Sequence, residues 1–247
     1  MKIFHITLII CFTILVSCEK QNKGTVISGL SDQLEDTTTV IKKELPIQDN
    51  ECSIDSLAMQ TTEYNKITFY TEDNLRGSGV INLSINKSTE IFNMDKTPYG
   101  KILVNNEDEN VFDIKLPKVI IAREIIPDSE HRVFSFDAEE PNSDKNFLII
   151  YINKQKKLIE KKNNNFVFNP WEKYIKSAFI QLTPEVPNTS KQELLYWYKV
   201  LEIKGDSMQV KSIPKTDCDY IEEYKNVTKW IKWKQNSCKL INFNFCY

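Results

Sequence analysis

The amino-acid sequence predicts a mainly β fold with one α-helix. Short segments rich in Ile, Val, Phe and Tyr recur along the chain and are bounded by turn residues, which is typical of antiparallel strands. One segment, about 170–182, instead repeats its apolar residues at helical spacing. The first 50 residues show neither pattern, so we expect the folded part of the chain to be residues 51–247.

The first 18 residues have the parts of a bacterial secretion signal. Lys2 is positively charged, residues 6–16 are mostly apolar, and Leu15-Val16-Ser17-Cys18 follows. This apolar run is too short to span a bilayer, which takes about 20 residues, and it fits a signal that is removed after export. The last four residues resemble the lipobox of bacterial lipoproteins. That resemblance implies residues 1–17 as the signal and lipidation of Cys18.

Residues 18–50 are predicted to form the lipidated N-terminus and a flexible tether. They contain few aromatic residues and a polar run at 36–39, a composition that buries too little apolar surface to fold. Two or more acyl chains give stable anchoring, and a flexible chain of this length reaches roughly 30 Å. We therefore expect a protein of the cell envelope, with membrane lipid as its partner through Cys18 and with the outer membrane as the favoured location.

Strands are predicted in series from residue 80 onward, where apolar and polar residues begin to alternate. The predicted strands are 80–85, 89–93, 101–104, 111–114, 119–124, 132–136, 147–153, 158–161, 165–168, 194–203, 208–213, 229–234 and 239–245. Turn residues between them predict hairpins at 153–157 and 235–237, a loop at 139–144 and a tight turn at Gly205-Asp206.

The helix is predicted from its start signal and its apolar face. Asn169 is placed as N-cap with Pro170 at the first helical position, and Glu172 completes a capping box. Pro184 ends the pattern. The apolar face contains Trp171, Tyr174, Ile175, Ala178, Phe179 and Leu182.

Several segments resemble bacterial SH3-like modules. In the last third of the chain these are Trp197-Tyr198-Lys199-Val200, 204–211 and Trp230-Ile231-Lys232-Trp233, and upstream they are 90–93 and 97–103. The resemblance implies a barrel built from about 80–104 and 194–247, with a large insertion at about 105–190 that holds several strands and the helix. Similar layouts occur in uncharacterised lipoproteins of the Bacteroidetes.

Two positions depart from the SH3-like pattern. Met208 stands where a Trp is usual, and Thr228-Lys229 replaces the Gly before the closing Trp. Because folds of this kind are widely reused, the resemblance carries little information on function.

Four cysteines remain if Cys18 is lipidated, in a compartment where disulfides persist. Cys238 and Cys246 are expected in one extended strand, roughly 26 Å apart and too far to bridge. Cys218–Cys238 is the favoured pair and Cys52–Cys246 the second, with four free thiols as the alternative. Their spacings match no zinc site, and no metal site is predicted.

The charge balance and the small numbers of glycine and histidine residues limit the kinds of ligand and catalytic site that we expect. The 32 basic and 34 acidic residues argue against a nucleic-acid partner, and six glycines leave no Gly-rich loop for a nucleotide. His131 is the one histidine after the signal and is expected at the surface. No cofactor is predicted. The acidic clusters 107–109 and 137–144 are expected as solvated turns, although the sequence leaves open whether they form a site.

Aromatic residues crowd the last third of the chain and are the candidate ligand contacts. They are Tyr220, Tyr224, Trp230 and Trp233. Trp230 and Trp233 are three positions apart, so on a strand they face opposite sides. An outward Trp beside a Tyr suits a groove for a peptide or glycan, whereas core packing is the favoured role for both tryptophans.

These observations favour a non-enzymatic envelope module that binds a protein, a peptide or a glycan. The first alternative is an immunity or inhibitor lipoprotein against a toxin that acts in the periplasm. The second is a carboxylate-dependent hydrolase, because the two carboxylates of such an enzyme meet in space and leave no mark in the sequence.

Overall fold

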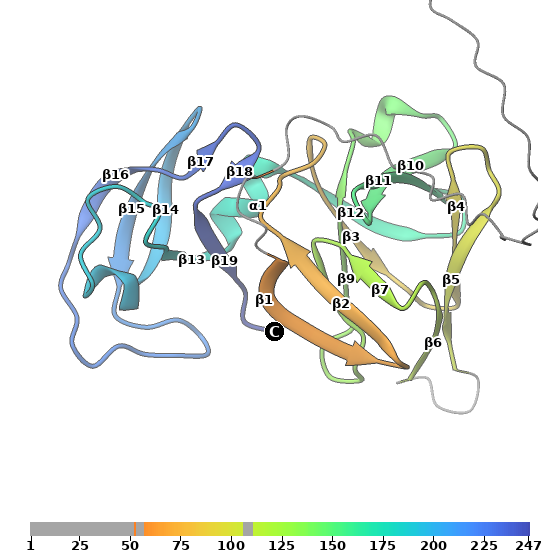
Figure 1. Ribbon diagram of the computed structural model, residues 1–247, viewed down its shortest axis with the longest axis horizontal. Coiled ribbons are helices and arrows are strands. Elements are labelled where there is room, and N and C mark those ends of the chain that lie inside the picture. The colour runs from red at the N-terminus through yellow and green to blue at the C-terminus, as the bar shows by residue number, and fades with distance from the viewer. Residues whose placement is uncertain (1–51, 53–56, 106–110) are drawn as a thin grey trace, which may run out of the picture. The chain divides into compact units, whose positions relative to one another are not determined.

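The computed structural model describes residues 52, 57–105 and 111–247, and it confirms a mainly β protein with one α-helix (Figure 1). Cys18, the predicted tether and the acidic cluster 107–109 lie outside the described residues. Strand pairing is antiparallel in every sheet except between β2 and β7, which run parallel. No helix among the described residues has the length and apolar character needed to cross a bilayer.

Two sheets are built from the first two thirds of the chain. The three-stranded sheet has the order β1-β2-β7, with β1 (Leu57–Tyr64), β2 (Ile67–Glu72) and β7 (Val119–Ile121). The nine-stranded sheet has the order β12-β3-β9-β10-β11-β4-β5-β6, with β8 paired to β9. Its strands are β3 (Gly79–Ser84), β4 (Ser88–Asn93), β5 (Pro98–Val104), β6 (Phe112–Lys115), β8 (Glu124–Ile126), β9 (Val133–Ala138), β10 (Phe147–Ile152), β11 (Gln155–Glu160) and β12 (Asn165–Pro170).

The last third of the chain forms a five-stranded sheet of order β16-β15-β14-β13-β19 and a hairpin of β17 and β18. These strands are β13 (Phe179–Leu182), β14 (Trp197–Lys204), β15 (Ser207–Ile213), β16 (Thr228–Lys232), β17 (Lys234–Gln235), β18 (Cys238–Lys239) and β19 (Ile241–Asn244). Helix α1 (Trp171–Ser177) contacts β3, β12 and β14 (Figure 1). Two short 3-10 helices are Pro141–Ser143 and Glu193–Leu195.

Alternating burial explains why these segments are strands. In β10, Leu148, Ile150 and Ile152 are fully buried while the residues between them are half-buried. One hydrophobic core joins the three-stranded and nine-stranded sheets, and a second lies between α1 and the five-stranded sheet. At about 25 cal/mol per Å² of apolar surface, this burial is the main stabilising contribution.

The predicted hairpin at 153–157 and the turn at Gly205-Asp206 are confirmed, and a turn also forms at 235–237. That last turn joins only β17 to β18, because β16 and β19, which hold most of the predicted strands 229–234 and 239–245, lie at opposite edges of the five-stranded sheet. Asn153 and Lys154 both have positive φ between β10 and β11, as the tightest hairpin turns require. Gly205 has a φ of 57° at the turn between β14 and β15. Asn236 has the same φ of 57° between β17 and β18.

The predicted helix is too long and its N-cap is wrong. Asn169 belongs to β12, where it pairs with Val80, and Pro170 is the N-cap. The helix ends at Ser177, and Phe179–Leu182 forms β13 instead. Ile180 and Leu182 are buried at alternate positions and pair with β19, so the apolar residues of this segment satisfy a strand as well as a helix. Sheet pairing overrides the local helical pattern here.

The SH3-like barrel with its insertion is not confirmed. Strands β3, β4 and β5, which the resemblance placed in the barrel, belong to the nine-stranded sheet together with β6 and β8–β12. Of the strands from residue 194 onward, β14 and β19 instead pair with β13, which lies in the predicted insertion. The predicted strand 119–124 also divides, because β7 pairs with β2 whereas β8 pairs with β9.

The cysteines pair differently from the prediction. Cys52 is bonded to Cys238, and Cys218 is bonded to Cys246. The favoured pair Cys218–Cys238 is wrong, because Cys238 is bonded to Cys52. Cys238 also forms a β-bridge with Asn74 of the β2–β3 connection, which is far from Cys238 in sequence but next to β18 in space. The second predicted pair, Cys52–Cys246, is also wrong, because Cys52 is bonded to Cys238 and Cys246 to Cys218.

Candidate functional site

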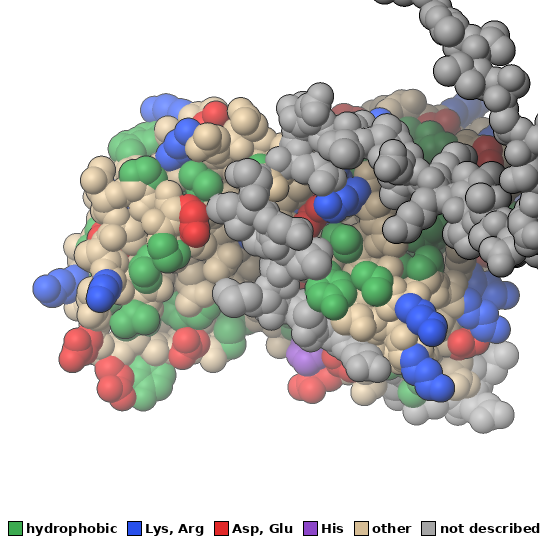
Figure 2. All heavy atoms as spheres, viewed as in Figure 1, with side chains coloured by type: hydrophobic (Ala, Val, Ile, Leu, Met, Phe, Trp, Pro, Cys, Tyr) green, Lys and Arg blue, Asp and Glu red, His purple; other side chains and the backbone are tan. Residues whose placement is uncertain are grey.

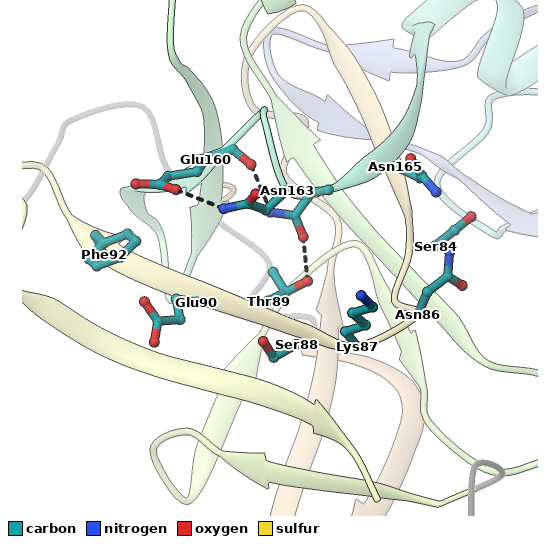
Figure 3. A pocket seen from close by; sticks show the side chains of 11 residues that line it. Ser84, Asn86, Lys87, Ser88, Thr89, Glu90, Phe92, Glu160, Asn163 and Asn165 are labelled. Carbon is teal, nitrogen blue, oxygen red and sulfur yellow. Dashed lines mark hydrogen bonds between the residues drawn. The ribbon is translucent and has the colours of Figure 1, made fainter. Parts of the chain in front are cut away.

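A polar pocket of about 460 Å³ lies where two connections of the nine-stranded sheet meet (Figure 3). One connection joins β3 to β4 and the other joins β11 to β12. The residues that line the pocket are Ser84, Asn86, Lys87, Ser88, Thr89, Glu90, Phe92, Glu160, Asn163, Asn164 and Asn165. This size is within the range of small-molecule sites.

Hydrogen bonds fix the two connections against each other. The Thr89 hydroxyl, which is buried, donates to Asn164 Oδ1 at 2.5 Å. The Asn164 amide donates to the backbone oxygen of Glu160 at 2.7 Å, and Asn163 Nδ2 donates to the Glu160 carboxylate at 3.3 Å. Figure 3 shows these bonds as a continuous line from Thr89 to Glu160. One wall of the pocket is therefore preorganised by its own side chains.

The lining is rich in groups that both donate and accept hydrogen bonds. Serine and threonine hydroxyls and asparagine amides do both, and they make up seven of the eleven residues in the lining given above. The charged members are Lys87, Glu90 and Glu160, so the pocket has a formal charge of about −1 at neutral pH. Phe92 adds one half-buried aromatic ring.

Two carboxylates, those of Glu90 and Glu160, line the pocket. Glu90 lies on β4 and Glu160 ends β11, each one residue beyond Ile91 and Ile159, the last pair of these two strands. Both glutamates are exposed to solvent. Sequence spacing alone did not reveal this pair, because 70 positions separate its members.

The predicted aromatic group is not brought together as one groove. Trp233 is buried and its indole donates to the Gly205 oxygen at 3.0 Å, whereas Trp230 is 44% exposed, so the two tryptophans do face opposite sides. The Tyr224 hydroxyl donates to the Ser212 oxygen at 2.9 Å and its ring packs on Tyr196. Tyr220 is exposed. Trp233 and Tyr224 are thus part of the framework of the five-stranded sheet.

The acidic residues of 137–144 point to separate partners. Asp137 is buried and bound to Arg123, and Glu139 accepts from Tyr151 at 2.7 Å and from Lys156 at 2.9 Å. The Lys156 bond, followed by that of Tyr151, holds the pKa of Glu139 below its usual value. Asp144 accepts two backbone N–H groups and closes a turn. The cluster does not converge on one site.

His131 lies at the surface, as expected, with its Nδ1 2.9 Å from Asp128. Across the described parts of the chain, no group of three or more His, Cys, Asp and Glu side chains could hold a metal ion.

The pocket residues were missed because their local signal was that of turns. Asparagine and serine dominate turns for reasons of backbone geometry, and Asn and Lys are abundant throughout this chain. The β3–β4 and β11–β12 connections meet because of the strand order. Strand β3 lies next to β12 and β4 lies next to β11, with β9 and β10 between the two pairs, so both connections cross the same part of the sheet.

The fold and the pocket define a disulfide-bonded, mainly β protein with a preorganised polar site. No known family matches this chain, and neither curated proteins nor solved structures give a match.

Proposed function

We propose that the protein is a lipid-anchored binding module of the bacterial cell envelope, and that its polar pocket binds a glycan. The observation that carries this proposal is the pocket itself, whose hydroxyl and amide lining both donates and accepts hydrogen bonds. Sugar hydroxyl groups require that combination of partners. Phe92 offers a flat ring for the apolar C–H face of a sugar.

The charge of the pocket favours a neutral ligand over the other classes. Two glutamates and one lysine repel a phosphate group rather than attract it. An apolar ligand would leave the amides and hydroxyls without partners, at roughly 1–3 kcal/mol for each buried group. A neutral oligosaccharide avoids both the charge repulsion and the loss of hydrogen bonds.

Two features support a location in the envelope. The Leu15-Val16-Ser17-Cys18 lipobox supports lipidation of Cys18. The two disulfides support export, since such bonds persist in oxidising compartments and are rare in the cytosol. We expect Cys18→Ala to abolish acylation and to remove the protein from the detergent-extracted membrane fraction. Continued acylation of this variant would contradict the anchor.

The pocket is tested by titrating the full chain in detergent with neutral oligosaccharides of glucose, mannose and galactose. Asn86→Ala and Asn163→Ala should each weaken binding by roughly 2-fold to 12-fold, the effect of one hydrogen bond of 0.5–1.5 kcal/mol. Asn226→Ala is the matched control, because Asn226 is exposed and lies outside the pocket. Equal affinities for all three variants would refute the pocket as the site.

A second candidate function is hydrolysis of the bound glycan by Glu90 and Glu160. The presence of both carboxylates in the pocket lining favours it, because glycosidases act with a pair of Asp or Glu residues on either side of the scissile bond. In that case Glu90→Gln and Glu160→Gln would abolish turnover of an oligosaccharide and leave its binding nearly unchanged. Absence of turnover by the unmodified chain would leave binding as the function.

A further inference from the structure

Lysines line the outward face of β14, β15 and β16 in ordered rows. Residues directly opposite each other in antiparallel strands share a face. Lys199 is opposite Lys211, and Ser207 is opposite both Lys204 and Lys232. Trp230 lies between these two rows, opposite Gln209. We call Lys199, Lys204, Lys211, Lys232 and Trp230 the lysine face, and all five side chains are exposed.

The lysine face is positive although the whole chain has a formal net charge of −2. Strands β14, β15 and β16 contain one acidic residue, Glu202, which binds Lys204 at 2.8 Å. The row of Lys199 and Lys211 and the row of Lys204 and Lys232 are four positions apart along β15, about 14 Å. This distance exceeds the Debye length of about 8–10 Å at moderate salt, so the two rows act on a nearby surface as separate pairs of charges. Figure 2 shows acidic and basic side chains interspersed over the surface that it draws.

Apolar side chains accompany the positive charge. Trp230 is 44% exposed, and the Lys204 ammonium lies 5.0 Å from its ring centroid. Leu201, at the β-bulge between Val200 and Glu202, is 48% exposed. Tryptophan rings are enriched where a membrane meets water, and each lysine near an anionic bilayer contributes about 1 kcal/mol of attraction. An exposed Trp among lysines therefore suits an anionic bilayer, because the indole ring suits its interface with water and the lysines suit its negative charge.

Most acidic residues near the lysine face lie toward the first residue of β14, although Glu202 and Asp206 lie at the other end, where they bind Lys204 and Lys234. Trp197, the first residue of β14, donates to Asp219 at 3.0 Å, and Asp219 belongs to the β15–β16 connection that also contains Asp217, Glu222 and Glu223. Lys204, the last residue of β14, lies at the end with Lys232. Lys204, Lys232 and Lys234 outnumber Glu202 and Asp206 at this end, so it keeps a net positive charge and lies away from the acidic connection.

We infer that the lysine face docks onto an anionic lipid bilayer and holds the five-stranded sheet against the membrane. The inference rests on the lipid anchor of the proposed function, which keeps the domain within roughly 30 Å of the bilayer and so raises the effective concentration of lipid at this face. Docking would fix the orientation of the pocket relative to the membrane.

The test uses the full chain reconstituted in vesicles whose phospholipid acyl chains carry bromine, a quencher of indole emission. Quenching is expected in phosphatidylglycerol vesicles and not in phosphatidylcholine vesicles, and Trp230→Phe should remove the quenched component. Replacing Lys204, Lys211 and Lys232 by Gln should lower the docking constant on the order of 100-fold, since each lysine contributes about fivefold. The matched control replaces Lys118, Lys145 and Lys162, which are exposed and outside the face.

Two outcomes would overturn the inference. One is quenching that does not depend on the lysine face. It would be equal in the unmodified chain and in Trp230→Phe, or it would fall equally in the triple lysine variant of the face and in the control triple variant. The other is a face that binds polyglutamate but shows no quenching in anionic vesicles, which would identify an acidic polypeptide as its partner. Flotation with the vesicles reports the lipid anchor separately, so a chain that floats without quenching is anchored but not docked.

Discussion

Arg123 and Asp137 form a bidentate ion pair inside the protein, with Nε–Oδ1 and Nη2–Oδ2 distances of 2.7 Å and 2.9 Å. Their side chains are 3% and 5% exposed. Burial alone would lower the pKa of Arg123, but the charge of Asp137 and its hydrogen bonds raise that pKa above the usual value. Arg123 Nη2 also donates to the Asn74 oxygen at 2.9 Å. The pair therefore ties β9 to the β2–β3 connection.

We expect Asp137→Ala to lower the free energy of unfolding by about 3–5 kcal/mol, because it leaves the Arg123 charge buried without its partner. Urea denaturation measures this loss. The control is Asp113→Ala, which removes the partner of Lys115 in a pair that is more than half exposed and should change stability by less than about 1 kcal/mol. The double variant Arg123→Met, Asp137→Leu should recover part of the loss. A double variant as unstable as Asp137→Ala would contradict this account.

Two glycines with positive φ are expected to respond differently to alanine. Gly77 and Gly205 have φ of 65° and 57°, so alanine is strained at both, by about 1–2 kcal/mol. A Cβ at Gly77 would lie 2.2 Å from the Ala138 oxygen, whereas nothing lies within 4 Å at Gly205. Gly77→Ala should therefore be the more destabilising by roughly a further 1–3 kcal/mol. Thermal unfolding of the two variants measures the difference, and equal losses would show that the contact with Ala138 relaxes freely.

The two disulfides close loops of very different length, and this predicts unequal contributions to stability. Cys52–Cys238 spans 186 residues and Cys218–Cys246 spans 28. In the chain-entropy description, the longer loop should contribute about 1.5 kcal/mol more. We expect Cys52→Ser, Cys238→Ser to be less stable than Cys218→Ser, Cys246→Ser by about that amount in guanidinium. The reverse order would show that native contacts, and not loop closure, decide the effect. Peptide mapping without reductant checks the pairing itself.

The sequence predicted strands and turns well because both depend on local chemistry. The alternation in β10 and the Asn153-Lys154 turn are visible in a few consecutive residues, and the structure confirms both. The end of the helix was not predictable in this way. Phe179–Leu182 has apolar residues that suit either a helix or a strand, and its choice depends on β19, about 60 residues later in the chain.

The pocket and the disulfides could not be predicted, because they depend on which distant segments meet. Thr89 contacts Asn164 because β4 pairs with β11, so the connection that leaves β11 begins beside β4. Cys238, which forms a β-bridge with Asn74, is bonded to Cys52 across 186 positions of the chain. Both juxtapositions depend on pairing between distant segments, and such pairing leaves no mark at a single position.

Glu124 and Glu139 are expected to give opposite pH dependences of stability. Burial raises the pKa of Glu124 above its ordinary 4.5, although the hydrogen bond from Tyr247 and the charge of Arg123 act in the other direction. The folded state then binds more protons than the unfolded state between pH 4.5 and the folded pKa. The stabilisation from protonated Glu124 is therefore complete below pH 4.5 and falls as pH rises through the folded pKa. For Glu139 the lowered pKa reverses the sign, so its contribution is present above pH 4.5 and is lost on acidification.

Glutamine variants separate these two effects, because glutamine has nearly the same shape and does not titrate. Relative to the unmodified chain, Glu124→Gln should gain stability as pH rises above 4.5 through the folded pKa of Glu124, where the unmodified chain loses the Glu124 contribution. Glu139→Gln should instead lose stability relative to the unmodified chain as pH rises toward 4.5, because the unmodified chain gains its Glu139–Lys156 ion pair in this range and the variant cannot form it. Urea denaturation at a series of pH values measures both differences. Parallel curves for the two variants would mean that neither carboxylate has the environment described, because a buried group and an ion-paired group cannot respond to protons with the same sign.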